Sequence, residues 1–483
     1  MLTEILDSGS ISSFDDSVDV LVVGLGCAGA AATLSAVEAG AKTLVVERAG
    51  GGGGTSAMSG GVMYLGGGTA LQKSCGFEDS PEEMFKYLRA SIGAGRDEAK
   101  LQLYCEGTVE HFDWLVAQGV PYKHTFYYGQ SGEPPTDDGL VWSGSENVAP
   151  FRDLAKPAPR GHVAAVPGAA GHKVMSSLCK AVAASGAVQS FNTICSALVQ
   201  ERDGTITGAR LETFGKTRFV RARGGVVLTT GGFILNDQML DAYRPEARLC
   251  QMRVAADGDD GSGIRLGMAA GAGTRHLDKV SVSLPVTQPW DLKRGLLVNA
   301  RGQRFINEDA YYGRLGDYAL LRQDGHCWLI VDDAIFVKPE YGFEVCAVGE
   351  TPAELGRELG LPEGALESTI DLFNRYAVKG QDPLFGKREP YLQPLVEAPF
   401  AAIDCNVESS RYAVFTLGGL ATDVDGRILD PELRPMRGLY GAGRSTAGIA
   451  VGGYSSGLSL GDGTFFGRRA GRAAARAPMT DRS

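Results

Sequence analysis

The chain has 483 residues, of which 44% are hydrophobic and 22% charged, so it is long enough to bury a sizeable core and is neither disordered nor fibrous. Its formal net charge of −10 and the lack of a long basic run before the last predicted helix argue against a nucleic-acid partner. No apolar run reaches the roughly 18 residues of a membrane-spanning helix, so we expect no transmembrane segment and a cytoplasmic location. The nine cysteines are odd in number and form no C-x-x-C pair, which predicts neither a disulfide framework nor a metal site.

The first predicted unit is a strand, a glycine turn, a helix and a second strand. The β-branched run VDVLVV at 18–23 is followed by Gly24, Gly26 and Gly29, and an alanine-rich helix then runs to about residue 39. A second buried strand at 41–47 ends in Glu47. This βαβ arrangement predicts a parallel sheet and a bound dinucleotide.

Each residue of this fingerprint has an expected role. The first glycine permits a tight turn, the second lets a pyrophosphate approach the backbone, and the third allows close packing of helix and strand. The N–H groups at the helix start, which include that of Ala28, are free to bind phosphate. Glu47 would accept hydrogen bonds from ribose hydroxyls, and neighbouring Arg48 means that NADP is not excluded on charge alone.

A second glycine-rich stretch at 50–61 favours FAD over NAD, because a flexible backbone could run there along a flavin ring and its ribityl chain. A solvent-exposed loop is the alternative for these glycines. The residues of this stretch that we expect at the cofactor are Thr55, Ser56, Met58, Gly60 and Gly61.

The middle of the chain alternates between helical and strand patterns. Helices are predicted at 81–92, 97–118 and 171–185, antiparallel strands at 194–200, 207–213 and 217–221, and a further buried strand at 224–233. Residues 122–167 have weak periodicity and fit either an ordered loop that lines a cavity or an insertion. Thr230 and Gly231, in the glycine-ended strand, are expected at the cofactor.

The pattern becomes mixed between about 276 and 409, with a helix at 363–378, and the glycine-rich character resumes afterwards. We therefore expect an α/β protein in which a Rossmann-like FAD-binding domain, 1–275 and 410–483, carries an inserted α+β substrate domain, or cap, at 276–409. The last helix would offer its N–H groups to a reduced flavin. The cofactor-binding residues expected near the C-terminus are Gly443, Arg444, Gly457, Ser459 and Leu460.

These segments together resemble FAD-dependent oxidoreductases related to soluble fumarate reductase flavoproteins and 3-ketosteroid dehydrogenases. The resemblance covers about residues 18–475 and is specific in combination. Besides the fingerprint, it rests on TTGGF at 229–233, RGQRFINED at 301–309, GLYGAGRSTAG at 438–448 and GYSSGLSLGDG at 453–463.

Two departures from the fumarate reductase pattern bear on the substrate. Val414 and Phe415 stand where a histidine pair normally precedes the T-x-G-G strand, and Tyr454 stands where an arginine would align. The chain therefore lacks the charge partners of a dicarboxylate, which implies a small, neutral, largely apolar ketone. The glycine stretch at 53–56 also lacks the histidine of the covalent-flavin members, so the resemblance implies non-covalent FAD.

Residues 454–457, Tyr-Ser-Ser-Gly, are similar to the motif of the 3-ketosteroid Δ4-(5α)-dehydrogenases. The resemblance implies a 3-ketosteroid substrate, whose ketone Tyr454 polarises. Ser456, assisted by Tyr311, would take a proton from C4 while C5 delivers a hydride to flavin N5. Tyr312 is the alternative to Tyr311, and each of these residues has a plain reading as a core aromatic or a helix-start serine.

Three other functions remain open at this point. They are a 3-ketosteroid Δ1-dehydrogenase, a fumarate-reductase-like enoate reductase, and a flavin-binding protein without catalysis in which FAD only stabilises the fold. The electron acceptor, the direction of the reaction and the stereochemistry at C5 are not identified by the sequence.

Overall fold

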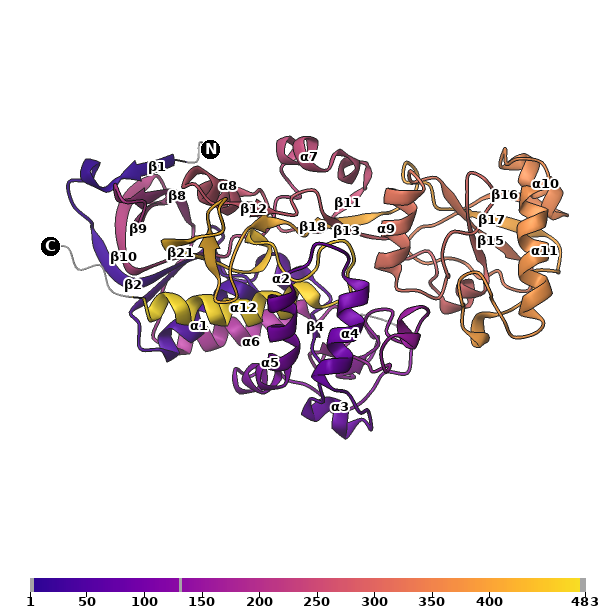
Figure 1. The fold of residues 1–483 in the computed structure, drawn as a ribbon, viewed down its shortest axis with the longest axis horizontal. Coiled ribbons are helices and arrows are strands. Elements are labelled where there is room, and N and C mark those ends of the chain that lie inside the picture. Colours follow the sequence, from indigo (N-terminus) through magenta and orange to yellow (C-terminus); the bar gives the residue numbers. More distant parts are fainter. Residues whose placement is uncertain (1–3, 130–132, 478–483) are drawn as a thin grey trace.

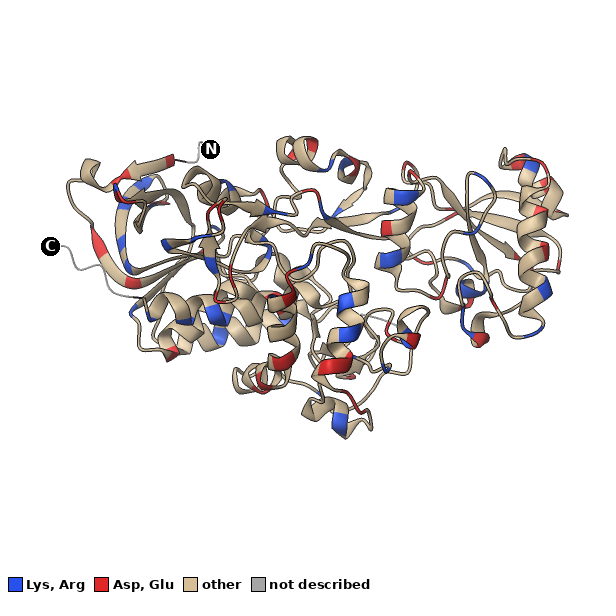
Figure 2. Cartoon of the chain, in the orientation of Figure 1, with Lys and Arg blue, Asp and Glu red and all other residues tan. Residues whose placement is uncertain are grey.

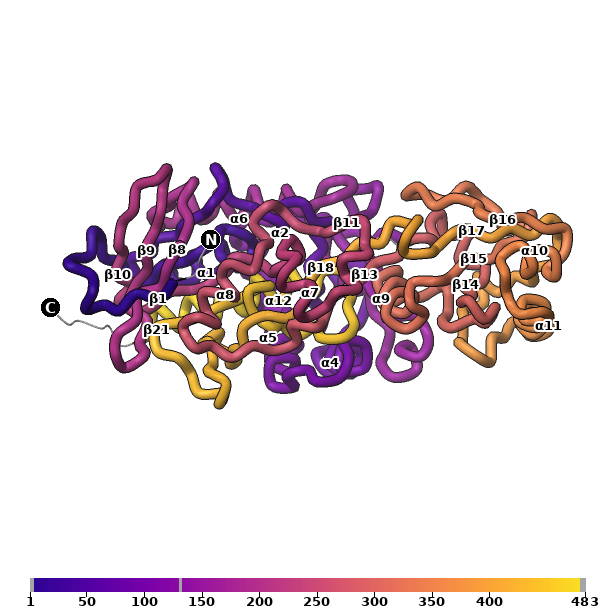
Figure 3. The backbone as a smooth tube through the Cα atoms, turned by 90° about the horizontal axis from the view of Figure 1, so that it is seen from above, coloured from indigo at the N-terminus to yellow at the C-terminus, as the bar shows by residue number. Residues whose placement is uncertain are grey.

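A computed structural model describes residues 4–129 and 133–477. The molecule is elongated (Figure 1): β1 and the C-terminal end of α12, the first and last described elements, lie with a large sheet at one end, and the elements between β14 and β17 form the other end. Figure 3, turned by 90°, shows the same separation, with α9 between the two parts.

The large sheet has nine strands. Its main path is β1 (Glu4–Asp7), β8 (Thr193–Gln200), β9 (Ile206–Thr213), β10 (Lys216–Leu228), β2 (Asp16–Val23), β3 (Thr43–Val46) and β7 (Val188–Ser190). Strand β21 (Pro435–Gly441) pairs in parallel with β10, and β20 (Arg427–Leu429) pairs with β21. Because β10, β2, β3 and β7 pair in parallel, the predicted α/β class and βαβ unit are confirmed.

Two of the helices on this sheet, α1 (Cys27–Glu38) and α12 (Leu458–Ala475), pack unusually closely on each other. A Cβ at Gly467 would lie 2.5 Å from the Ala28 carbonyl oxygen, and a Cβ at Gly471 would lie 2.0 Å from that of Ala32. Glycine therefore permits the contact that holds the last helix over the first. Helix α6 (Gly171–Ala184) packs beside α1, and Gly40, at φ 88°, follows the end of α1 as predicted.

The predicted elements of the middle region are present with small changes in bounds. The helices are α4 (Pro81–Ser91), α5 (Glu98–Ala117) and α6, and the strands β8, β9 and β10 are antiparallel as expected. One detail of the prediction is wrong: 217–221 and the strand after it form a single strand, β10, which ends at Leu228. Gly225, at φ 137°, creates an irregularity that lets β10 continue from β9 to β2.

Residues 122–167, which the sequence leaves open between a loop and an insertion, contribute to a small sheet. Its strands are β4 (Val62–Tyr64), β6 (Gly161–Val163) and β5 (Leu140–Val141), and α3 (Ala70–Ser74) follows β4 in the chain. The Tyr64 amide donates to the Gly457 carbonyl oxygen at 3.1 Å, so this sheet is joined directly to the start of α12.

The far end of the molecule contains a four-stranded antiparallel sheet. Its strands are β14 (Leu296–Asn299), β15 (Cys327–Asp332), β17 (Phe400–Asp404) and β16 (Val345–Gly349), with α10 (Pro352–Glu358) and α11 (Ala365–Ala377) nearby. The predicted helix at 363–378 is α11. The division into 1–275 with 410–483 and 276–409 remains a prediction.

Short elements connect the two ends. Strand β18 (Ala413–Thr416) pairs with β13 (Val280–Ser283) and with β11 (Met252–Arg253), while β12 (Thr274–Arg275) pairs with β19 (Gly419–Leu420). Helices α7 (Asp237–Tyr243) and α8 (Ser262–Ala269) lie near β11 and β12 in the chain, and α9 (Tyr312–Arg322) packs on β13.

Charged residues of both signs occur along the described part of the chain (Figure 2). Among the helices of the described residues, none is both long and apolar enough to cross a membrane. The same residues hold no group of three or more His, Cys, Asp or Glu side chains arranged to bind a metal ion.

Asp317 on α9 leads to a prediction about stability. The carboxylate accepts a hydrogen bond from the Val282 amide at 2.9 Å, and burial raises its pKa to about 8. Because the folded state holds this proton more tightly than the unfolded state, stability falls as pH rises from about 4 through 8. We expect Asp317→Asn to raise the melting temperature above that of the wild type by more at pH 9 than at pH 5, with a difference of at least about 2 °C. Scanning calorimetry at several pH values measures this, and Asp113→Asn, an exposed change on α5, is the control.

Candidate active site

The turn between β2 and α1 requires two of its three glycines for its own packing. Gly24 has φ 101°, and a Cβ there would lie 2.5 Å from the Thr229 carbonyl oxygen. A Cβ at Gly29 would lie 1.9 Å from the Gly24 carbonyl oxygen. Both positions therefore exclude larger residues whether or not a ligand is bound.

The remaining fingerprint glycine has a different environment. Gly26 has φ −80°, which any residue adopts, and a Cβ there would meet nothing closer than the Ser56 hydroxyl oxygen at 3.5 Å. The fold itself does not need a glycine at this position, and space is left beside the N-terminus of α1. This fits a phosphate group that approaches the backbone closely. The neighbouring Cys27 amide donates to the Ser56 hydroxyl at 3.2 Å, which ties the second glycine stretch to the first.

Glu47 lies at the end of β3, facing the same turn. One carboxylate oxygen accepts from the Leu25 amide at 2.8 Å and the other from the Ala49 amide at 2.9 Å. Each oxygen keeps capacity for a second hydrogen bond, so the predicted contact with ribose hydroxyls is compatible with this geometry. Arg48 is exposed and pairs with Asp260 at 3.0 Å.

A polar centre joins three of the glycine-rich segments. Thr55, on α2 (Gly54–Met58), donates to the Asp259 carboxylate at 3.1 Å, and Arg444 donates to the same carboxylate oxygen. The other Asp259 oxygen and one terminal nitrogen of Arg444 are buried without a partner in the described residues. Unpaired buried polar atoms are costly, so they indicate a polar group that completes the site. Asp259 is a site residue that the sequence analysis does not identify.

The other predicted cofactor residues lie around this centre. A Cβ at Gly231, φ 84°, would contact Asp259 at 3.4 Å, and the Thr230 hydroxyl lies 3.3 Å from that of Ser445. A Cβ at Gly443 would lie 2.9 Å from that of Ala28. The structure therefore brings together loops that are far apart in sequence.

The three predicted cofactor residues at the end of the second glycine-rich stretch have different surroundings. Gly61 has φ 71°, and a Cβ there would lie 2.3 Å from the Ala170 carbonyl carbon, so close packing requires glycine. A Cβ at Gly60 would meet the Glu133 side chain at 2.8 Å. Met58 is 66% exposed, and its place at the cofactor remains a prediction.

The start of α12 carries the predicted catalytic tyrosine. Gly457 is the N-cap, at φ 97°, and the Tyr454 hydroxyl oxygen accepts a hydrogen bond from the Ser459 amide at 3.0 Å. The Tyr454 ring meets Phe415 edge to face, with centroids 5.1 Å apart, and Leu460 is buried in the same turn. Burial raises the Tyr454 pKa and outweighs the lowering by the Ser459 hydrogen bonds and by Arg444. Tyr454 therefore keeps its proton and can donate it in a hydrogen bond.

A cluster of hydroxyl groups forms where α9 begins near α12. The Tyr312 and Ser456 hydroxyl oxygens are 3.4 Å apart, and the rings of Tyr311 and Tyr312 lie against each other with centroids 4.3 Å apart. Burial, Tyr312 and Tyr454 raise the Tyr311 pKa well above its usual value, while a hydrogen bond to Ser456 lowers it. Burial also raises the Tyr312 pKa, which hydrogen bonds to Ser456 and Tyr311 lower. The hydroxyls of Tyr311, Tyr312, Tyr454 and Ser456 thus form one group.

A buried ionic cluster supports the segment that leads to Tyr311. Arg304 pairs with Glu308 at 2.8 Å, Lys387 pairs with Glu308 at 3.0 Å, and Asp309 pairs with Arg388 at 2.8 Å. Burial acts to raise the Glu308 pKa, but Arg304 and Lys387 outweigh it and hold the pKa below its usual value. Breaking such a buried pair is strongly destabilising, so the cluster fixes the chain just before the tyrosines.

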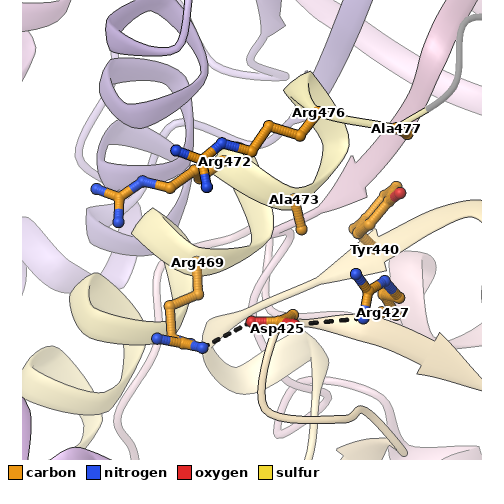
Figure 4. A pocket seen from close by; sticks show the side chains of 8 residues that line it. All are labelled: Asp425, Arg427, Tyr440, Arg469, Arg472, Ala473, Arg476 and Ala477. Atoms are coloured by element: carbon orange, nitrogen blue, oxygen red, sulfur yellow. Dashed lines mark hydrogen bonds and ion pairs between the residues drawn. The ribbon is translucent and has the colours of Figure 1, made fainter.

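A cavity of about 350 Å³ lies at the opposite end of α12 (Figure 4). Arg469 and Arg427 both pair with Asp425 at its edge, and Arg472 and Arg476 also line it. The 18 residues of α12 span about 27 Å. This cavity is therefore separate from the hydroxyl cluster at the helix start.

Comparisons with known proteins agree with this arrangement. The family described as "FAD binding domain" matches residues 19–459. The crystal structure of 3-ketosteroid-Δ4-(5α)-dehydrogenase from Rhodococcus jostii RHA1, in complex with 4-androstene-3,17-dione, is 42% identical to this chain. The two structures superpose with a TM-score of 0.93, and the alignment covers 98% of this chain and 99% of the Rhodococcus chain.

Two curated relatives extend the comparison. A 3-oxo-5-alpha-steroid 4-dehydrogenase of Comamonas testosteroni is 28% identical over 91% of this chain and 95% of its own length. The probable fumarate reductase Ifc3 of Shewanella frigidimarina is 28% identical over 95% of this chain and 75% of its own length. The predicted resemblance to both groups is thereby confirmed.

Proposed function

The chain belongs to the FAD binding domain family, and within this family of FAD-dependent oxidoreductases we propose that it is a 3-ketosteroid Δ4-dehydrogenase. It would introduce the C4–C5 double bond into ring A of a 3-ketosteroid, or reduce that bond in the reverse direction. The open space beside Gly26 at the start of α1 and the unpaired polar atoms of Asp259 and Arg444 fit FAD as the cofactor. We propose that FAD is held without a covalent bond, because the stretch from Gly53 to Ser56 contains no histidine.

The observation that carries this proposal is the uncharged hydroxyl cluster of Tyr454, Ser456, Tyr311 and Tyr312 at the start of α12. A ketone needs a hydrogen-bond donor at its oxygen and a proton acceptor at its α-carbon, and hydroxyl groups supply both without a formal charge. The Rhodococcus relative, crystallised with 4-androstene-3,17-dione, supports a 3-ketosteroid as the substrate. The electron acceptor that reoxidises the enzyme is not identified.

The residues divide the work as follows in the oxidative direction. When bound, FAD would supply the acceptor for the hydride that leaves C5. Tyr454 keeps its proton and donates a hydrogen bond to the ketone oxygen, where negative charge develops as C4 loses its proton. Ser456 takes the C4 proton and passes its own hydroxyl proton to Tyr311 in the small fraction of molecules in which Tyr311, whose pKa is raised well above its usual value, is ionised. Because serine alone is a weak base, the tyrosine is essential to this step.

Product analysis tests the proposal directly. The purified yellow protein is incubated with 5α- and 5β-3-ketosteroids and an artificial electron acceptor, and the enone ultraviolet band is followed. We expect the 4-ene product from one of the two epimers. A 1-ene product would assign the enzyme to the Δ1-dehydrogenases, and no turnover by FAD-loaded protein would favour enoate reduction or a non-catalytic role.

Two single substitutions separate the adjacent tyrosines. The Tyr312 hydroxyl oxygen lies 3.4 Å from that of Ser456, and Ser456 also lowers the Tyr311 pKa. Both tyrosines therefore face the serine, and we keep Tyr311, which the family resemblance favours, as the proposed proton acceptor. We expect Tyr311→Phe to lower kcat by about 100-fold and Tyr312→Phe by about tenfold or less, within the usual contribution of a catalytic acid or base. Because the Tyr311 pKa is raised, wild-type kcat should also increase with pH from 7 to 9, and Tyr311→Phe should lose this increase. The reverse order of the two losses would assign the role to Tyr312.

A further inference from the structure

We propose that residues 143–146, Ser-Gly-Ser-Glu, form a strap that positions the two proton-transferring residues, with Ser145 as its principal positioning residue. This inference rests on the proposed function of Ser456 and Tyr311. The strap belongs to the segment 122–167, whose role the sequence leaves open.

The strap makes one hydrogen bond to each proton-transferring residue. The Tyr311 amide donates to the Ser145 hydroxyl at 3.0 Å, and the Ser456 amide donates to the Ser143 carbonyl oxygen at 2.9 Å. Tyr311 precedes α9 and Ser456 precedes α12, two helices that start 146 residues apart in the chain. One short segment thus fixes the backbones of both residues relative to each other.

The other side of the strap rests on a buried tyrosine. The Ser145 amide donates to the Tyr87 hydroxyl at 2.9 Å, and the same hydroxyl is 2.8 Å from that of Ser455, the residue before Ser456. A Cβ at Gly144 would lie 2.4 Å from the hydroxyl oxygens of both Tyr87 and Ser455. Only a glycine at this position lets the strap come so close to the Tyr-Ser-Ser-Gly turn.

Glu146 holds the conformation of the strap itself. The residue is 1% exposed, and one carboxyl oxygen accepts a hydrogen bond from the Gly144 amide at 3.0 Å. Burial raises the pKa of this carboxyl group, and Arg160, which also pairs with Asp79 at 2.7 Å, only partly offsets the rise. A buried carboxylate that folds back on its own segment makes the strap a fixed support rather than a loop free to adjust.

Such a support affects the chemical step more than substrate binding. The reacting groups must hold a near-attack geometry, and a shift of about 1 Å costs on the order of 100-fold in rate. Neither Ser143 nor Ser145 contributes a charge, and both are buried behind the catalytic residues, at 2% and 3% exposure. The inferred effect therefore falls on kcat, with KM and FAD binding retained.

Ser145→Ala in the full-length, FAD-loaded enzyme tests the inference. The variant removes the acceptor of the Tyr311 amide and keeps the Ser145 amide that donates to Tyr87. We expect kcat to fall about tenfold with KM within twofold of wild type and an unchanged FAD-to-protein ratio. The control is Ser185→Ala at the end of α6, where a serine hydroxyl likewise accepts a backbone amide, that of Ala187 at 3.3 Å. It should retain wild-type kcat.

A crystal structure of Ser145→Ala separates failure of this inference from failure of the proposed function. We expect the hydroxyl separation of Tyr312 and Ser456, 3.4 Å in the wild type, to widen as the chain at Tyr311 moves. An unchanged hydroxyl cluster, or an unchanged kcat, would overturn the strap. If wild-type enzyme oxidises no ketosteroid, the proposed function fails, and the crystal structure alone then decides the positioning claim.

Tyr87→Phe is the second variant, to be used if Ser145→Ala does not load FAD. It removes the acceptor of the Ser145 amide, and we expect kcat to fall about threefold. The structural criterion is the same widening of the hydroxyl separation between Tyr312 and Ser456.

Discussion

Tyr454→Phe is expected to lower kcat by about 100- to 1000-fold, the usual cost of removing one hydrogen-bond donor to a developing oxyanion. The phenylalanine keeps the edge-to-face contact with Phe415 and removes only the hydroxyl. Because the raised pKa of Tyr454 keeps its proton in place, the loss should be similar at pH 7 and pH 9. Anaerobic stopped-flow measurement of flavin bleaching by a saturated 3-ketosteroid isolates this step from reoxidation.

The same substitution leaves the Ser459 amide without its acceptor, so the loss of a helix cap must be separated from the loss of catalysis. An N-cap contributes about 1 kcal/mol, which is far less than the catalytic effect and appears in the melting temperature. Tyr412→Phe is the matched control, because the buried Tyr412 hydroxyl donates to the Cys405 carbonyl oxygen at 2.7 Å, away from α12. Wild-type bleaching rates in Tyr454→Phe would remove Tyr454 from the mechanism.

The FAD-binding unit is predictable from the sequence because its signals are local. The glycines at 24, 26 and 29 lie between a β-branched strand and an alanine-rich helix, and each local preference agrees with the fold. The proposed catalytic residues are predictable only through the resemblance, because nothing local distinguishes Tyr454 or Ser456 from a core tyrosine and a helix-start serine.

The residues that the sequence analysis does not identify depend on contacts between distant segments. Asp259, at the polar centre, lies 204 residues after its partner Thr55, and Ser145 lies 166 residues before its partner Tyr311. Single-sequence patterns describe periodicity and turns within some tens of residues, so they contain no signal for such pairs. The error in β10 has the same origin. The local pattern ends one strand at 221 and begins another at 224, whereas pairing with β2 continues β10 past Gly225 with a shift in register.

Gly26→Ala is expected to weaken FAD binding at least tenfold, or about 1.4 kcal/mol, while the apoprotein keeps nearly its wild-type stability. The backbone φ of −80° suits alanine, and the new Cβ would meet protein atoms no closer than 3.5 Å. The methyl group would instead occupy the space through which a pyrophosphate reaches the backbone at the start of α1. Titration of the apoprotein with FAD, followed by flavin fluorescence, gives the Kd, and the apoprotein melting temperature gives the stability.

Gly29→Ala provides the contrast that makes this result interpretable. Its Cβ would lie 1.9 Å from the Gly24 carbonyl oxygen, so the turn itself must distort and the apoprotein should lose several kcal/mol of stability. The two glycines thus separate the two demands on the fingerprint: the packing of helix on strand requires Gly29, and we propose that the ligand requires Gly26. Wild-type FAD affinity in Gly26→Ala would show that the cofactor does not approach the backbone at this position. A destabilised Gly26→Ala apoprotein would show that the fold, rather than the ligand, requires this glycine.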